Sequence, residues 1–299
     1  ASMHQSPATD MDSPPPNQEH MATAAAAAGG GAPGRRTLLL LSMAIMIVGA
    51  VGGPLFTRIY FLHGGSRLWL MSLLQTVGFP IVLVTLAASY LHRSRRGGSR
   101  RTFSVTARGS AACVALGMLG ALNAYMYAYG SASLPVSTSS LLVSTQVAFT
   151  AVFAYLVVRQ RFTPYSVNAV VLLVMGPVVL ALNSSGDRPA GESKGRYYLG
   201  FFMMLGTAAL LGLSLPLIEL LYLRMRRKIT YTLVMEMHLV ICISATTTCV
   251  VAMLINKDFQ AIPREAKEYG LGETKYYLVL AACAVLWQLM NLGFVGVIS

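Results

Sequence analysis

Residues 53–80, GPLFTRIYFLHGGSRLWLMSLLQTVGFP, decide the fold of this chain. Two long apolar runs meet here at the polar turn 63–66, which contains two consecutive glycines, and this pattern predicts a helical hairpin. The second run carries Trp69 and Gln75 in a stretch that is long and apolar enough to cross a bilayer. An amide at that depth needs a hydrogen-bond partner or a ligand. We therefore interpret the hairpin as a membrane element and as a candidate wall of a binding site.

The composition of the whole chain indicates an integral membrane protein. Of its 299 residues, 55% are hydrophobic and only 11% are charged. The net charge of +12 does not indicate nucleic-acid binding, because the basic residues cluster between apolar runs and not on one soluble surface. The four cysteines lie in apolar segments without metal-ligand spacing, and no phosphate loop or nucleophile with a base is found. We predict that the protein is not an enzyme and has no cofactor.

Eight apolar segments have about the 20 residues needed to span hydrocarbon. Their approximate ranges are 37–61, 67–90, 109–130, 134–158, 165–183, 198–222, 230–255 and 277–299. In the first of them, small residues at Gly49, Gly52 and Gly53 predict close packing against another helix. The sequence thus predicts an all-α polytopic protein with eight transmembrane helices.

The loops between these segments predict the orientation. Arginine and lysine are concentrated in the loops that follow the second, fourth and sixth segments, which all lie on one face and are therefore cytoplasmic. The loop 257–275 on the other face carries four basic and four acidic residues. Residues 1–34 are rich in proline, alanine and glycine and lack a signal or transit peptide pattern, which predicts a disordered cytoplasmic tail before a transmembrane domain at 35–299.

A short internal similarity indicates a repeat. Pro54 and Tyr60 in PLFTRIY correspond to Pro216 and Tyr222 in PLIELLY, with the same spacing of six. Five helices separate the two copies, so they would have opposite orientations, as in transporters built from inverted repeats. The predicted repeats cover about 35–190 and, incompletely, 191–299. Coincidence in apolar sequence is the alternative.

Several long motifs resemble the plant purine permease family, over about residues 38–298. They are 53–80, AYGSASLPVSTSSLL (128–142), QVAFTAVFAYLVVRQRFTPYSVNAVVLL (146–173), SSGDRPAGESK (184–194), ITYTLVMEMHLV (229–240) and NKDFQAIPREAKEYGLGETKYY (256–277). The resemblance implies the drug/metabolite transporter fold, with ten helices in two inverted sets of five. The last two helices of that fold are then missing here, either because the chain is a fragment or because it is an eight-helix variant. The resemblance also implies uptake of adenine, cytokinins and related purines, driven by the proton gradient, at the plasma membrane.

Carboxamides on four helices are the candidate substrate-binding residues. By helix rise they share one layer between the midplane and the outer side of the membrane. A carboxamide offers a donor and an acceptor side by side, which suits the edge of a purine. Hydrogen bonding between helices is the alternative for each of them. The four residues are Gln75, Asn123, Gln146 and Gln288.

Two aromatic residues join this candidate site. Tyr127 follows Asn123 by one helical turn, and Trp287 precedes Gln288. Each is placed to stack on a flat heterocycle. Tryptophan and tyrosine also gather at bilayer interfaces without binding a ligand.

Glu219 and Glu236 are the acidic residues inside the predicted spans, and a buried charge at this depth is costly. A carboxyl group with a raised pKa would bind a proton outside and release it inside, as proton symport requires. We expect Glu236 to be the better coupling residue. Glu219 has an alternative role in an ion pair with Arg224 or Arg58.

Two other functions remain open at this point. The same amide layer would suit a carrier for another nitrogen heterocycle, such as an alkaloid or a form of vitamin B6. A non-transporting, truncated membrane protein is the other alternative. The sequence leaves the physiological substrate and the oligomeric state open.

Overall fold

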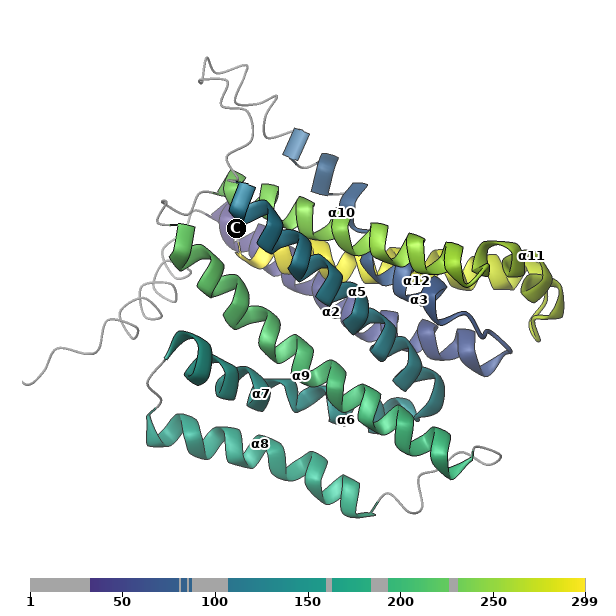
Figure 1. The fold of residues 1–299 in the computed structure, drawn as a ribbon, viewed down its shortest axis with the longest axis horizontal. Helices are drawn as coiled ribbons and strands as arrows, with labels where there is room; N and C mark the ends of the chain where they lie inside the picture. The colour runs from purple at the N-terminus through teal and green to yellow at the C-terminus, as the bar shows by residue number, and fades with distance from the viewer. Residues whose placement is uncertain are drawn as a thin grey trace, which may run out of the picture.

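The computed structural model describes residues 33–80, 82–84, 86–87, 107–159, 163–183, 193–225 and 231–298 (Figure 1). The predicted disordered tail lies almost entirely outside these residues. The helices, in chain order, are α2 (Pro33–Leu62), α3 (Leu68–Thr76), α5 (Ala107–Ser133), α6 (Val136–Ser144), α7 (Gln146–Phe153), the π-helical turn η1 (Ala154–Val158), α8 (Pro164–Asn183), α9 (Lys194–Met225), α10 (Tyr231–Ile255), α11 (Asp258–Glu268) and α12 (Glu273–Ile298).

Helices occupy all eight predicted spans, so the prediction of an all-helical polytopic membrane protein is confirmed. Six of them are long and apolar enough to cross a membrane, counted over the described residues. The second span is interrupted after α3 and becomes helical again from residue 79, and the fifth contains the shorter apolar helix Pro164–Gly176. The inverted repeat stays a prediction.

The helices pack as a bundle with α5 at its centre. Helix α5 contacts α3, α9 and α10, while α2 pairs along its length with α12 (Figure 1). On the other side of α9 lie α6 and α7, and α8 packs at the edge of the bundle against these two. Helix α5 is therefore in contact with helices from both sides of the bundle.

Glycines permit the close contact between α2 and α12. A Cβ atom on Gly49 would lie 2.6 Å from the carbonyl oxygen of Leu286, so no larger residue fits there without moving the helix. Gly52 and Gly53 face the side chains of Leu286 and Trp287 in the same way. The prediction that these three glycines support close helix packing is confirmed.

A buried carboxylate joins the first hairpin to the α11 region. Glu265 on α11 is only 8% exposed. Its Oε1 accepts hydrogen bonds from the hydroxyls of Tyr60 and Tyr276, the latter at 3.2 Å, and its Oε2 accepts from the hydroxyl of Ser66 at 2.8 Å. These residues belong to α2, α12 and the α2–α3 turn, so one side chain connects three segments. We call the end of the bundle where they meet the α11 end.

Arg67 supplies the positive charge at this end. Its Nε lies 3.4 Å from Glu265, and its Nη1 lies 3.3 Å from Asp258, the first residue of α11. Both carboxylates are buried, whereas the arginine side chain is partly exposed. Arg67 therefore balances two acids from the helix that covers the hairpin turn.

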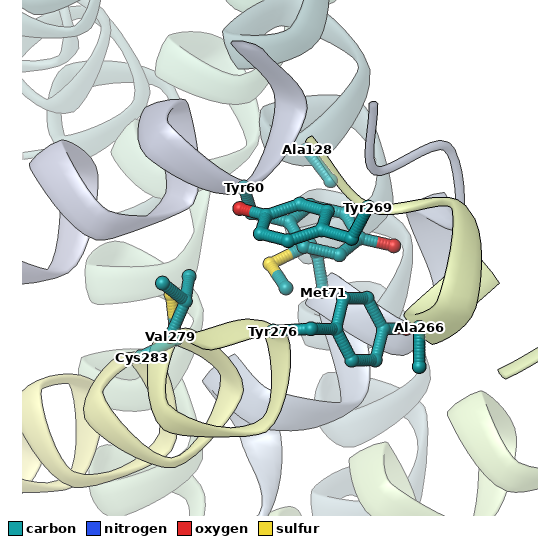
Figure 2. Close-up of a cluster of buried hydrophobic side chains, with 8 residues drawn as sticks. All are labelled: Tyr60, Met71, Ala128, Ala266, Tyr269, Tyr276, Val279 and Cys283. Atoms are coloured by element: carbon teal, nitrogen blue, oxygen red, sulfur yellow. The ribbon is translucent and has the colours of Figure 1, made fainter. Parts of the chain in front are cut away.

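Three tyrosine rings fill the space beside this ion pair. The ring centroids of Tyr60 and Tyr269 are 6.4 Å apart, and those of Tyr269 and Tyr276 are 5.2 Å apart in an edge-to-face contact. Figure 2 shows these rings above α12, together with Met71 and Ala266. The polar contacts of Glu265 are thus shielded by an apolar cluster.

Replacing Glu265 with alanine is expected to destabilise the protein by roughly 3–5 kcal/mol, because it leaves Arg67 and two buried hydroxyls without their acceptor. Glu268→Ala is the matched control, since Glu268 is exposed on the same helix. Thermal unfolding of the detergent-solubilised protein, followed by fluorescence-detected size exclusion, measures the difference. Equal melting of both variants would contradict the role given to Glu265.

Candidate functional site

The second span is interrupted beside the candidate site. Helix α3 ends at Thr76, and residues 77 and 78 are not helical. Pro80 explains the interruption, because its ring lacks an N–H and would clash with the carbonyl of Thr76 in a continuous helix. The interruption leaves backbone carbonyls of α3 without their usual intrahelical partners.

Side chains from two other helices satisfy these carbonyls. Gln288 Nε2 donates to the carbonyl of Leu74 at 3.4 Å, and Asn291 Nδ2 donates to that of Gln75 at 3.5 Å. From α10, the hydroxyl of Thr246 donates to the carbonyl of Thr76 at 3.2 Å. Gln288, predicted as a substrate ligand, therefore has one structural contact in the empty protein, and Asn291 was missed by the sequence analysis.

Three of the four predicted amides keep an unused polar atom. Within the described part of the chain, Nε2 of Gln75, Oδ1 of Asn123 and Oε1 of Gln288 are buried and have no hydrogen-bond partner. They come from α3, α5 and α12, and α3 packs against each of the other two. Such an atom costs about 1–3 kcal/mol when it stays unsatisfied. One donor and two acceptors are thus available to a ligand in this amide cluster, which we define as Gln75, Asn123 and Gln288.

Gln146 lies elsewhere. It is the first residue of α7, directly after an interruption of the fourth span at Thr145, and α7 packs mainly against α9. Its backbone carbonyl lies 3.0 Å from the position that a Cβ on Gly212 of α9 would occupy. The structure therefore places three of the four predicted amides on α3 and the two helices that contact it, and Gln146 on a helix outside this group. The roles of all four stay predictions.

The two predicted aromatic residues contact each other. The ring centroids of Tyr127 and Trp287 are 5.4 Å apart, with the rings almost perpendicular. Trp287 Nε1 donates to the hydroxyl of Thr57 at 3.3 Å, which fixes the indole against α2. By contrast, Trp69 stacks on Tyr125 at 4.4 Å. Tyr127 and Trp287 thus form a rigid aromatic pair between α5 and α12.

A cavity of about 190 Å³ lies on the other side of Tyr127, between α2, α5 and α6. Its wall includes Arg58, Ser131 and Ser139 in addition to Tyr127 and several apolar side chains. Of the predicted site residues, only Tyr127 is part of this wall. The sequence analysis did not assign Arg58 to a binding site, although a basic residue inside an apolar span is a visible signal.

Arg58 is anchored at the end of α5. Its Nη1 donates to the carbonyls of Ser131 and Ala132, each at 2.8 Å. These carbonyls belong to the last turn of α5, where a helix has unsatisfied acceptors and a partial negative charge. A cation inside the span is thereby stabilised, and its position in the cavity wall is fixed.

The two predicted proton-coupling acids differ in burial. Glu236 on α10 is 1% exposed, whereas Glu219 is on the exposed surface of α9. Gly200 of α9 contacts Ser133 at the α11 end, and Glu219 is 19 residues further along, roughly 28 Å by helix rise. Glu219 therefore lies far from Arg58, and the alternative pairing between them is wrong. The coupling roles themselves stay predictions.

Comparison with known proteins gives concordant matches. A family model described as purine nucleobase transmembrane transport matches residues 37–299. The chain is 40% identical over 261 residues to Purine permease 3 of Arabidopsis thaliana, covering 86% of this chain and 74% of that protein. It is 41% identical over 272 residues to Purine permease 2 of the same plant, covering 86% and 76%. Probable purine permease 5, also from Arabidopsis thaliana, is 34% identical over 257 residues, covering 86% and 70%.

Gln75→Met is expected to leave the melting temperature of the empty protein unchanged or to raise it, because it removes an unsatisfied buried donor at nearly constant volume. The same change should weaken stabilisation by added purine base, if the amide cluster binds it. Leu74→Met is the control, since it alters an apolar side chain in the same turn. A clear fall in melting temperature for Gln75→Met alone would show that the amide is structural.

Proposed function

This chain belongs to the purine permease family, and on this basis we propose that it is a secondary active transporter that takes up purine nucleobases and their derivatives, including adenine and cytokinins, together with protons. The proposal follows from family membership and from the buried amide atoms that the empty protein leaves unsatisfied. Because the family consists of permeases, no catalytic residue is assigned. The proton gradient is the proposed driving force, without a cofactor.

The amide cluster supports a purine as the ligand. A donor at Gln75 and acceptors at Asn123 and Gln288 complement a ring that carries acceptor nitrogens next to an N–H or amino group. The Tyr127–Trp287 pair lies beside Gln288 and offers aromatic surface for a flat ring. We propose that these five residues contact the substrate during transport, and Gln146 is retained as a weaker candidate.

The basic loops support the proposed orientation. If they lie in the cytoplasm, then the α11 end faces outward and residues 1–34 are cytoplasmic. Uptake from outside would then begin at the end that carries Arg58, Arg67 and α11. The plasma membrane is the proposed location.

Glu236 is the proposed proton carrier. It is buried in α10, within the candidate span Leu233–Ile255, which is where a proton carrier on a path through the membrane is required. Glu219 is the second candidate, and its exposed position makes it less suited to sensing a proton in the interior.

Uptake of labelled adenine by cells that lack their own nucleobase carriers tests the function. We expect saturable uptake that rises as the external pH falls and is abolished by a protonophore. Unlabelled cytokinins, alkaloids and vitamin B6 forms serve as competitors and identify the preferred heterocycle. The chain is tested alone and in a form extended with two further helices, and absence of uptake by both would refute the transporter proposal.

Glu236→Gln is expected to remove the pH dependence of uptake while sparing exchange of labelled for unlabelled base, because exchange needs no net proton movement. Glu219→Gln is the control and should retain the pH dependence. Initial uptake rates across external pH values, normalised to the amount of protein in the membrane, provide the measurement. Unchanged pH dependence in Glu236→Gln would remove this residue from the coupling mechanism.

A further inference from the structure

The cavity beside Arg58 has the composition of a small-molecule site. It lies near the α11 end, bounded by the end of α2, the end of α5 and the start of α6. One part of the wall is polar, with Arg58, Ser131 and Ser139, and the remainder is apolar, including Ala50, Pro54 and Val143. Pockets for flat organic molecules combine these features, with apolar faces and a few convergent polar groups.

Ser139 contributes an unsatisfied hydroxyl to this cavity. The residue is 6% exposed, and its Oγ has no hydrogen-bond partner among the described residues. Its neighbour Ser140 also lines the cavity, but that hydroxyl donates to the carbonyl of Ser137 at 2.9 Å. Two adjacent serines in one wall thus differ in whether the fold already uses their hydroxyl group.

The rest of the polar wall is held in place by the fold. Arg58 is fixed by the carbonyls at the end of α5, and Tyr127 is supported from behind by the edge-to-face contact with Trp287. Both side chains are therefore positioned before a ligand arrives, which reduces the entropy lost on binding. A cationic donor and a hydroxyl in one wall favour a ligand edge that carries hydrogen-bond acceptors.

The volume gives the scale of the ligand. About 190 Å³ is below the roughly 300 Å³ at which pockets for drug-sized ligands begin, and it suits a single flat base. Two of the lining residues, Ala50 and Ser140, are exposed, so the cavity is open on one side. A substituent on the base would extend through this opening.

We propose that this cavity is a second purine-binding subsite, which receives a purine base with its acceptor edge toward Ser139 and Arg58 and one face beside Tyr127. It is distinct from the amide cluster, whose members do not line it. The inference rests on the proposed function, since it names a further site for the same class of substrate.

Binding of labelled adenine to the purified full chain tests the subsite directly, without transport. Ser139→Ala should weaken binding roughly fivefold to tenfold, the effect of losing one hydrogen bond. Ser140→Ala should change it little, because that hydroxyl is already used by the fold.

A cavity-filling variant provides a second test. Ala50→Leu adds volume to the wall at the open side of the cavity and should weaken adenine binding, whereas Ala44→Leu, on the same helix but outside the cavity wall, should not. If wild-type protein binds adenine and all four variants bind it equally, the subsite is refuted while the proposed function stands. If wild-type protein binds no purine base, the proposed function and the subsite both fail.

Discussion

The buried carboxylate of Glu265 is the interaction on which the arrangement of the α11 end depends. Helices in a bilayer gain little from apolar contact with one another, because lipid is equally apolar, so polar contacts help to select their register. Glu265 does this by accepting hydrogen bonds from α2, from the α2–α3 turn and from α12. Arg67 neutralises it and also pairs with Asp258. Burial raises the pKa of Asp258, the nearby Glu265 charge adds to this, and Arg67 acts against it. Glu265 bonds to three segments, whereas Asp258 pairs with Arg67, so Glu265 connects α11 to more of the bundle.

Helix α12 connects the α11 end to the candidate site, so the contacts of Glu265 also fix the position of α12 beside that site. Its first turn holds Tyr276 against Glu265, and about three turns later Trp287 bonds to Thr57 of α2. Gln288 and Asn291 follow and satisfy the carbonyls exposed by the interruption after α3. The glycines of α2 allow α12 to lie close enough for these contacts. The satisfaction of these carbonyls, the aromatic pair and the position of Gln288 thus all depend on where α12 is held.

The parts of the fold set by hydropathy could be predicted from the sequence, and those set by contacts between distant segments could not. Helices occupy the eight predicted spans because each span has to bury its own backbone hydrogen bonds. The sequence analysis did not predict helix α11. It used loop 257–275 only for its balance of basic and acidic residues, whereas the signal for α11 is the amphipathic pattern of its sequence. The interruption at residues 77–78 was missed although Gly78 and Pro80 indicate one. The depth of each residue along its helix predicted the layer of amides. Depth does not say which side of its helix a residue faces, so it could not predict that Gln146 lies apart from the other three.

Unsatisfied polar groups give a criterion for proposing substrate contacts that depth alone does not give. Thr57, Thr246 and Asn291 are polar residues inside the bundle, and each makes a contact with another helix. Gln75 Nε2, Asn123 Oδ1, Gln288 Oε1 and Ser139 Oγ are buried without such contacts in the described structure. Evolution tolerates a cost of this kind where function needs the group, and the cost is relieved when a ligand supplies the missing partner. Tyr127 is part of the cavity wall, and its ring contacts that of Trp287, which precedes Gln288 in α12. In the proposed arrangement this aromatic pair separates the cavity from the amide cluster.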